Sequence, residues 1–145
     1  MLQSEPKFFV KIAETEEELH SAHRLRYEVF VKELGSSGPL IDHKNLLEKD
    51  EFDPYFDHLI LYDLAKHECS TSDVVGVYRL LPHDKALELG RFYSEGEYDL
   101  DVLKASGRRM LELGRSCLHQ NYRGGSAMYY LWKALSEYVL QRDIE

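Results

Sequence analysis

The sequence contains few cysteines and no long apolar run. Cys69 and Cys117 are the two cysteines among 145 residues, and they form neither a CxxC pair nor a Cys/His ligand set. This spacing excludes a disulfide framework and a typical zinc site. No apolar stretch approaches the ~20 residues that cross a bilayer, and the N-terminus lacks the basic start and apolar run of a signal peptide. We therefore expect a cytoplasmic protein in which Cys117 packs as a small apolar side chain.

Basic residues are also scarce, and their distribution is uneven. Lysine and arginine number 18 against 26 acidic residues, and the net charge of −8 argues against general nucleic-acid binding. Residues 1–57 hold 13 acids and 7 basic residues, whereas residues 101–125 hold 5 basic residues and 2 acids. The basic segment is either an ordinary solvated surface or a surface for an acidic partner. His20 and His23 lie one helical turn apart without a third ligand, so we predict no metal site.

Apolar periodicity predicts one α/β domain over residues 1–145, and the composition is that of a soluble globular protein. The predicted strands are 8–13, 58–65, 74–82 and 109–119, and the predicted helices are 15–34, 99–106 and 125–143. Thr15 and Glu18 have the spacing of a capping box, and Gly35 is expected to end that helix. The polar segment after residue 65 is short enough to join its flanking strands as an antiparallel pair.

The turn before the last predicted helix has the composition of an anion site. Arg123, Gly124 and Gly125 come directly before the helix start. Unpaired N–H groups and a partial positive charge mark a helix N-terminus, and glycines allow a phosphate to come close. The alternative is a tight turn that needs glycine for conformational reasons alone.

Glu112 and Arg115 lie in the strand before that turn. Strict alternation places these two side chains on opposite faces, unless a β-bulge re-aims one of them. An acid in an apolar strand is expected to have a raised pKa, which suits a general base. The alternative is a structural charge with a partner.

Charged residues elsewhere form a second set of candidates. Glu48, Asp50 and Asp53 form an acidic cluster that could hold a cationic substrate or a metal, although no EF-hand spacing follows it, or could be a solvated loop. Arg26 and Arg79 need partners if they are buried, and the acidic cluster is an obvious source.

Several blocks of this sequence resemble a known family. The blocks RLRYEVFVKELG, EKDEFDPYFDHLIL, VVGVYRLLP, GRFYSEGEYDL and LELGRSCLHQNYRGG occur in the order and spacing of the ornithine N-acyltransferases, across about residues 8–143. These enzymes have the GNAT fold and are similar to the acyl-homoserine-lactone synthases. The resemblance implies a mixed, mainly antiparallel sheet with flanking helices. It also implies that the chain is the amino-terminal part of that fold, ending after the helix that follows the fourth strand.

The motifs shared with the lactone synthases are carried over position by position. An arginine followed four positions later by an aromatic matches Arg26 and Phe30, and a strand arginine matches Arg79. The E-x-D-x-x-D pattern matches Glu48, Asp50 and Asp53, and E-x-x-R matches Glu112 and Arg115. A tryptophan of the synthases is replaced by Ser36, which favours the lipid acyltransferase.

The resemblance implies acyl transfer from a 3-hydroxyacyl carrier protein to the α-amine of ornithine, the first step of ornithine lipid synthesis. Glu112, or a water that it holds, would accept the proton. Glu48, Asp50 and Asp53 would hold the distal ammonium, and Arg79 or Arg115 the carboxylate. A backbone N–H of Leu118 or His119 would polarise the thioester.

The donor would be a phosphopantetheine thioester, with no permanently bound cofactor. Arg123, Gly124, Gly125 and Ser126 would contact its phosphate. Asn121, Gly124 and Ser126 match the GNAT turn motif Q/R-x-x-G-x-G/A imperfectly, which favours a carrier protein over coenzyme A.

The expected partners are an acidic acyl carrier protein and ornithine. A further expectation is peripheral association at the inner membrane face through the lipid product.

The aromatic residues Tyr129, Tyr130 and Trp132 are expected to pack in the core rather than to line an acyl tunnel. The alternatives are a lactone synthase, which needs S-adenosylmethionine, and a non-catalytic module that binds a carrier protein or a lipid surface.

Overall fold

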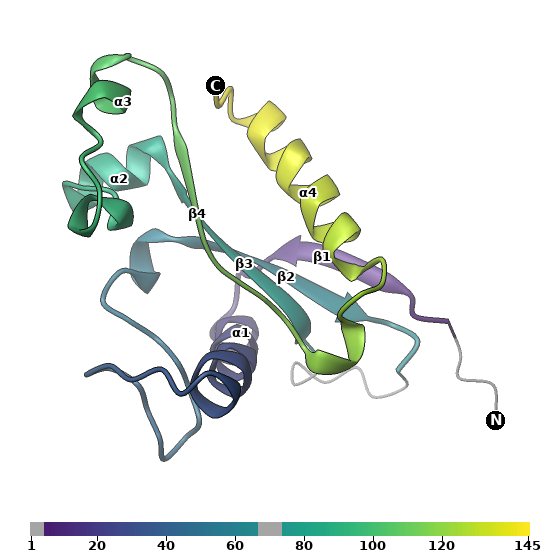
Figure 1. Cartoon of the computed structure of the whole chain (residues 1–145). Helices are drawn as coiled ribbons and strands as arrows, with labels where there is room; N and C mark the ends of the chain where they lie inside the picture. Colours follow the sequence, from purple (N-terminus) through teal and green to yellow (C-terminus); the bar gives the residue numbers. More distant parts are fainter. Residues whose placement is uncertain (1–4, 67–73) are drawn as a thin grey trace.

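The computed structural model describes residues 5–66 and 74–145, and within them four strands form one antiparallel sheet in the order β1-β2-β3-β4 (Figure 1). The strands are β1 (Phe8–Ile12), β2 (Asp57–Asp63), β3 (Val74–Pro82) and β4 (Leu111–Leu118). This arrangement confirms the predicted fold class and the four predicted strands. The predicted polar connection between β2 and β3, with Cys69, lies outside the described residues.

Two helices cover opposite faces of the sheet, α1 (Glu16–Arg26) on one and α4 (Ala127–Gln141) on the other (Figure 1). Thr15 and Glu18 form the predicted capping box at the start of α1. The predicted helix does not stay α-helical to residue 34, because residues Tyr27–Glu33 form a π-helix. The Leu34 N–H donates to the Val29 carbonyl, five residues earlier, at 3.2 Å.

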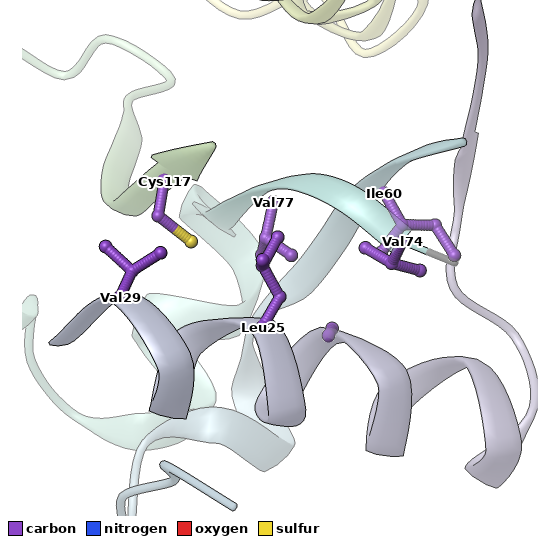
Figure 2. Packing of buried hydrophobic residues seen from close by; sticks show 7 residues of the cluster. Leu25, Val29, Ile60, Val74, Val77 and Cys117 are labelled. Carbon is purple, nitrogen blue, oxygen red and sulfur yellow. The ribbon is translucent and has the colours of Figure 1, made fainter. Parts of the chain in front are cut away.

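The α1 face of the core is made of small and branched side chains. Leu25 and Val29 pack against Val77 of β3 and Cys117 of β4 (Figure 2). Cys117 is buried, as predicted, and burial raises the pKa of its thiol to about 12. The α4 face is centred on Leu131 and Tyr138.

Side chains of β4 and α4 lie so close to Gly76 of β3 that any larger residue there would force them to shift. A Cβ at Gly76 would lie 2.9 Å from Leu118 Cδ2 and 3.2 Å from Leu131 Cδ1. The aromatic side chains on the outer face of α4 contradict the sequence prediction. Tyr129 and Trp132 are 65% and 60% exposed, and Tyr130 is 39% exposed, so they are not core residues.

Shorter helices join β3 to β4 at one end of the sheet (Figure 1). They are α2 (His83–Leu89), a 3₁₀ turn at Tyr93–Gly96, and α3 (Asp101–Ala105). Two further 3₁₀ turns, Asp53–Tyr55 and Gln120–Tyr122, precede β2 and α4. Among the described residues, no helix is long and apolar enough to span a bilayer.

Candidate active site

Six charged side chains predicted from sequence form one closed ring of ion pairs, which we call the arginine–carboxylate ring. Each arginine bridges two carboxylates and each carboxylate bridges two arginines. In order around the ring they are Arg26, Asp53, Arg79, Asp50, Arg115 and Glu48. Its formal charges cancel, which makes the burial of most of its members tolerable.

The inner part of the ring is tight. Arg26 Nε lies 2.6 Å from Glu48 Oε2, and Arg26 Nη1 lies 2.6 Å from Asp53 Oδ1. Arg79 Nη1 contacts Asp53 Oδ1 at 2.8 Å and Asp50 Oδ1 at 2.8 Å. The Arg79 guanidinium also lies 4.2 Å from the centroid of the Phe56 ring, in a cation–π arrangement.

Solvent reaches the ring at one edge. The side chains of Arg26, Arg79, Glu48 and Asp53 are at most 7% exposed, whereas Arg115 is 27% and Asp50 21% exposed. The structure therefore makes Arg26, Arg79, Glu48 and Asp53 partners of one another, the alternative left open by the sequence. Within the ring, Asp50 and Arg115 are the two members that present partly exposed charge to a ligand.

Two pKa shifts reflect this burial. Burial alone would raise the pKa of Asp53, but hydrogen bonds from His58 and Arg26 and the charges of Arg26 and Arg79 hold it well below its ordinary value. Burial and the nearby Arg26 charge lower the pKa of His23 to about 4. Both groups are therefore held in the protonation states that suit a buried cation, with Asp53 ionised and His23 neutral.

His23, Asp53 and His58 bring potential metal ligands within 4.8 Å of one another. The centre of that group is already cationic, because Arg26 Nη1 lies 3.1 Å from His58 Nε2 and 2.6 Å from Asp53 Oδ1. A metal ion there would face the guanidinium charge, so this donor set does not fit one. His58 had no signal in the sequence beyond its place in a strand.

A hollow of about 250 Å³ lies over the exposed edge of the ring, and we call it the Asp50 pocket. Its lining combines charged side chains with apolar and aromatic ones. Its lining is Ser37, Gly38, Pro39, Leu40, Ile41, Glu48, Lys49, Asp50, Glu51, Phe52, Tyr93 and Arg115. Sequence reasoning missed Tyr93 and the 37–41 loop, because nothing in their spacing links them to Arg115.

A β-bulge in β4 explains how Glu112 and Arg115 come to the same face. Gly114 pairs with Arg79, but the next pair toward the end of β4 is Cys117 with Val77, so two residues of β4 oppose one of β3. Arg115 has a φ of +50°, in the left-handed region that a non-glycine residue seldom adopts. This conformation turns Arg115 toward the ring. The sequence analysis expected such a bulge if Glu112 and Arg115 were to share one face of the strand.

The surroundings of Glu112 differ from the apolar strand that the sequence predicts. Its carboxylate accepts hydrogen bonds from the Tyr93 N–H at 2.6 Å, from the Ser94 N–H at 2.9 Å, and from the Ser94 hydroxyl. Both carboxylate oxygens are therefore occupied by one turn. The predicted role of Glu112 as proton acceptor stays a prediction, and the apolar surroundings on which it rested are absent from this part of the structure.

A second hollow, of about 290 Å³, lies on the other side of the bulge, and we call it the Cys117 groove. It is largely apolar, and its lining is Val29, Phe30, Glu33, Leu34, Ser116, Cys117, Leu118, Arg123 and Met128. Phe30 of this groove also contacts the Asp50 pocket, since its ring lies 5.8 Å from the Arg115 guanidinium. The two hollows are thus lined by consecutive residues of the bulge, the Asp50 pocket by Arg115 and the Cys117 groove by Ser116.

The sequence analysis named the N–H groups of Leu118 and His119 as alternative donors to the thioester, and one of them already has a partner in the sheet. The His119 N–H donates to the Val75 carbonyl at 2.8 Å and is not free. Since the N–H groups of a strand point alternately to its two sides, the Leu118 N–H points to the outer edge of β4. The Leu118 carbonyl faces the same edge, because it accepts hydrogen bonds from the side chain of Arg123.

The turn into α4 is exposed and glycine-rich, as predicted. Gly124 has a φ of +78°, and Ser126 takes the N-cap position without a side-chain cap hydrogen bond. Arg123 forms a bidentate pair with Glu33, at 2.9 and 3.0 Å. A phosphate at this turn would have to share Arg123 with Glu33.

Comparison with known proteins agrees with this geometry. Residues 25–133 match the family described as the acetyltransferase (GNAT) domain, and the chain belongs to that family. The fold is that of solved acyl-transferring synthases. It matches FeeM, an N-acyl amino acid synthase from uncultured soil microbes, with a TM-score of 0.69 at 14% identity over 97% of this chain and 69% of that one. It matches the AHL synthase LasI with a TM-score of 0.66 at 19% identity, over 97% and 70% of the two chains.

Curated relatives are more similar in sequence. The chain is 57% identical to the L-ornithine N(alpha)-acyltransferase of Rhodobacter capsulatus over 94% of its length, and 35% identical to the enzyme of the same name from Brucella abortus, also over 94%. These alignments cover 52% and 49% of the two relatives. The chain thus spans about half the length of the curated relatives it matches.

Proposed function

We propose that this protein carries the acyl-transfer site of an L-ornithine Nα-acyltransferase, which moves a 3-hydroxyacyl group from acyl carrier protein to the α-amine of ornithine. The observation that carries the proposal is that consecutive residues of one β-bulge, Arg115 and Ser116, line two different hollows. The Asp50 pocket is charged and fits a small amino acid, whereas the Cys117 groove is largely apolar and follows the edge of β4. The relatives named for this reaction support the choice of substrate.

The Asp50 pocket would hold ornithine. The guanidinium of Arg115 suits the α-carboxylate, and the Asp50 carboxylate suits the distal ammonium. Both side chains stay oriented when a ligand enters, because Asp50 is also held by Arg79 at 2.8 Å and Arg115 by Glu48 at 3.4 Å. Arg79, predicted as an alternative carboxylate ligand, is buried behind Asp50 and serves as its support.

The Cys117 groove would hold the acyl-pantetheine arm along the outer edge of β4. There the Leu118 N–H is available to polarise the thioester carbonyl. The phosphate would meet Arg123 and the turn Gly124–Ser126 at the start of α4. Exposed Arg108 and Arg109 lie at the opposite end of β4, where Arg109 pairs with Asp84 of α2 at 3.2 Å, so they would have to meet an acidic carrier protein at a separate place.

The reaction then joins the two hollows. The neutral α-amine attacks the thioester carbonyl carbon, a C–N bond forms, and the C–S bond breaks. The amine loses one proton and the pantetheine sulfur gains one, so that no further co-reactant is needed. The lipid product would leave toward the membrane, and the protein would act in the cytoplasm or at the inner membrane face.

The test is to incubate the protein with 3-hydroxyacyl carrier protein and L-ornithine, and to identify products by mass spectrometry. We expect Nα-(3-hydroxyacyl)ornithine and free carrier-protein thiol. An acyl-lactone formed from S-adenosylmethionine instead would identify a lactone synthase. Binding of the loaded carrier protein without transfer to any amino acid would identify a binding module.

A further inference from the structure

Glu112 contacts the site through one intermediate residue. It lines neither the Asp50 pocket nor the Cys117 groove. Its carboxylate instead accepts hydrogen bonds from the Tyr93 and Ser94 N–H groups, at 2.6 and 2.9 Å, and these residues precede it by 19 and 18 positions. The Ser94 hydroxyl makes a third contact. One carboxylate thus fastens the Tyr93–Gly96 turn to β4, and we call these three hydrogen bonds the Glu112 clamp.

The residue held by this clamp is part of the pocket. The Tyr93 ring lies 5.7 Å from the Arg115 guanidinium, 5.4 Å from that of Arg79, and 5.1 Å from the Phe52 ring. Phe52, Tyr93 and Arg115 all line the Asp50 pocket. The Tyr93 ring therefore forms a wall beside the two charges that would bind the ends of the amino acid.

We infer that Glu112 is a positioning residue that holds the Tyr93 ring in place. The position of this ring limits the length of the acceptor side chain that fits the Asp50 pocket. The inference rests on the proposed function. A base must reach the amine, whereas Glu112 lines neither hollow and directs all three of its hydrogen bonds to one turn. Tyr93 is the specificity-determining residue in this arrangement, because the space between its ring and Asp50 decides how many methylene groups fit.

The clamp predicts a distinctive result for Glu112→Gln. The glutamine amide N–H₂ would face the N–H of Ser94, so the turn loses at least one hydrogen bond and Tyr93 moves. We expect L-ornithine to bind about 10-fold more weakly, and the preference for ornithine over lysine to fall by a similar factor, since one methylene group is worth about 10- to 200-fold. The pH profile of kcat should keep its acidic limb.

Tyr93→Ala should show the same two effects. The variant that combines both changes should bind L-ornithine as weakly as the worse of the two single variants and no more weakly, because both changes act through the Tyr93 ring. Glu97→Gln, an exposed change near the same turn, is the matched control and should leave both values unchanged. Binding is measured by titration calorimetry, specificity by competition between the two diamino acids, and folding by thermal unfolding.

The opposite pattern would overturn the inference. If Glu112→Gln lowers kcat by ~10²–10⁴ and removes the acidic limb while ornithine affinity and specificity stay unchanged, Glu112 is the general base. Additive losses in the double variant would also overturn it. Amide hydrogen exchange at Tyr93 and Ser94 tests the clamp without any substrate, and exchange that is equally slow in Glu112→Gln would refute it. A wild type that binds no ornithine would instead refute the proposed function, and the inference with it.

Discussion

Arg115 and Asp50 form an ion pair of 3.2 Å although they are 65 residues apart in the sequence. Arg115 comes from a bulge in β4, and Asp50 from the loop before β2. They are the exposed edge of a ring whose other four members are buried. The ring therefore combines a buried structural part with an edge that a ligand can reach, and the two parts should respond differently to substitution.

Neutralising Asp53 should destabilise the fold, and neutralising Asp50 should weaken ligand binding. Asp53→Asn leaves Arg26 and Arg79 with uncompensated buried charge, and we expect the free energy of unfolding to fall by about 3–5 kcal/mol. Asp50→Asn is the matched control, because its side chain is 21% exposed, and it should lower stability by about 1 kcal/mol or less. Urea unfolding and ornithine titration measure the two effects, and equal losses of stability would contradict the division of the ring.

Stability should fall as the pH drops from about 6.5 to 4, because the folded protein holds His23 neutral. The pKa of His23 is lowered on folding, so the unfolded chain binds more protons in this window. Above the unfolded pKa, His23 is neutral in both states and costs no stability. As the pH falls from there toward the folded pKa, the free energy of unfolding drops by up to ~1.4 kcal/mol per pH unit. His23→Asn keeps a donor toward the Glu48 carbonyl and should flatten this slope. Exposed His20→Asn is the control, and an unchanged slope in His23→Asn would refute the assignment.

Arg123 and Glu33 should have opposite effects on donor binding. Arg123→Ala removes a cation from the turn before α4 and should weaken binding of the phosphopantetheine-loaded carrier protein more than that of the bare one. Glu33→Gln releases Arg123 from its bidentate pair and should strengthen binding of the loaded form. Titrations of both carrier forms measure this difference. Equal effects on loaded and bare carrier would remove Arg123 from the phosphate site.

Cys117 should be unreactive in the folded protein. Burial raises the pKa of its thiol to about 12, so very little thiolate exists near neutral pH. In a Cys69→Ser background, a thiol reagent such as dithionitrobenzoate should label less than one tenth of the protein without denaturant, and all of it in denaturant, on the basis of the thiolate fraction. Rapid labelling of the native protein would show that the Cys117 groove opens to solvent along β4.

The regular parts of this fold are predictable from sequence because they depend on local pattern. Alternation identifies the strands, and Thr15 with Glu18 identifies the start of α1. The irregular parts depend on tertiary contacts. Nothing local marks Arg115 as a residue with a φ of +50°, and nothing local marks the π-helix after Arg26.

The candidate site was predictable as a set of residues but not as a set of roles. The motifs place Glu48, Asp50, Asp53 and Arg79 in one region, yet burial decides which of them a ligand can reach. The surroundings of Glu112 depend on a turn 18 residues earlier, which sequence spacing does not reveal. Tyr129 and Trp132 have the composition of core residues, but the face of α4 on which they lie is exposed.

The π-helix at Tyr27–Glu33 allows related proteins to diverge by a change of one residue in the length of this segment. Successive residues of an α-helix are turned by about 100°, so deleting one residue here would restore α-geometry and rotate everything that follows. Phe30 would leave Arg115 and Glu33 would leave Arg123, while Leu25 would keep its place against the sheet. A single-codon deletion would thus reshape the Asp50 pocket and the Cys117 groove at once and leave the core of the domain intact.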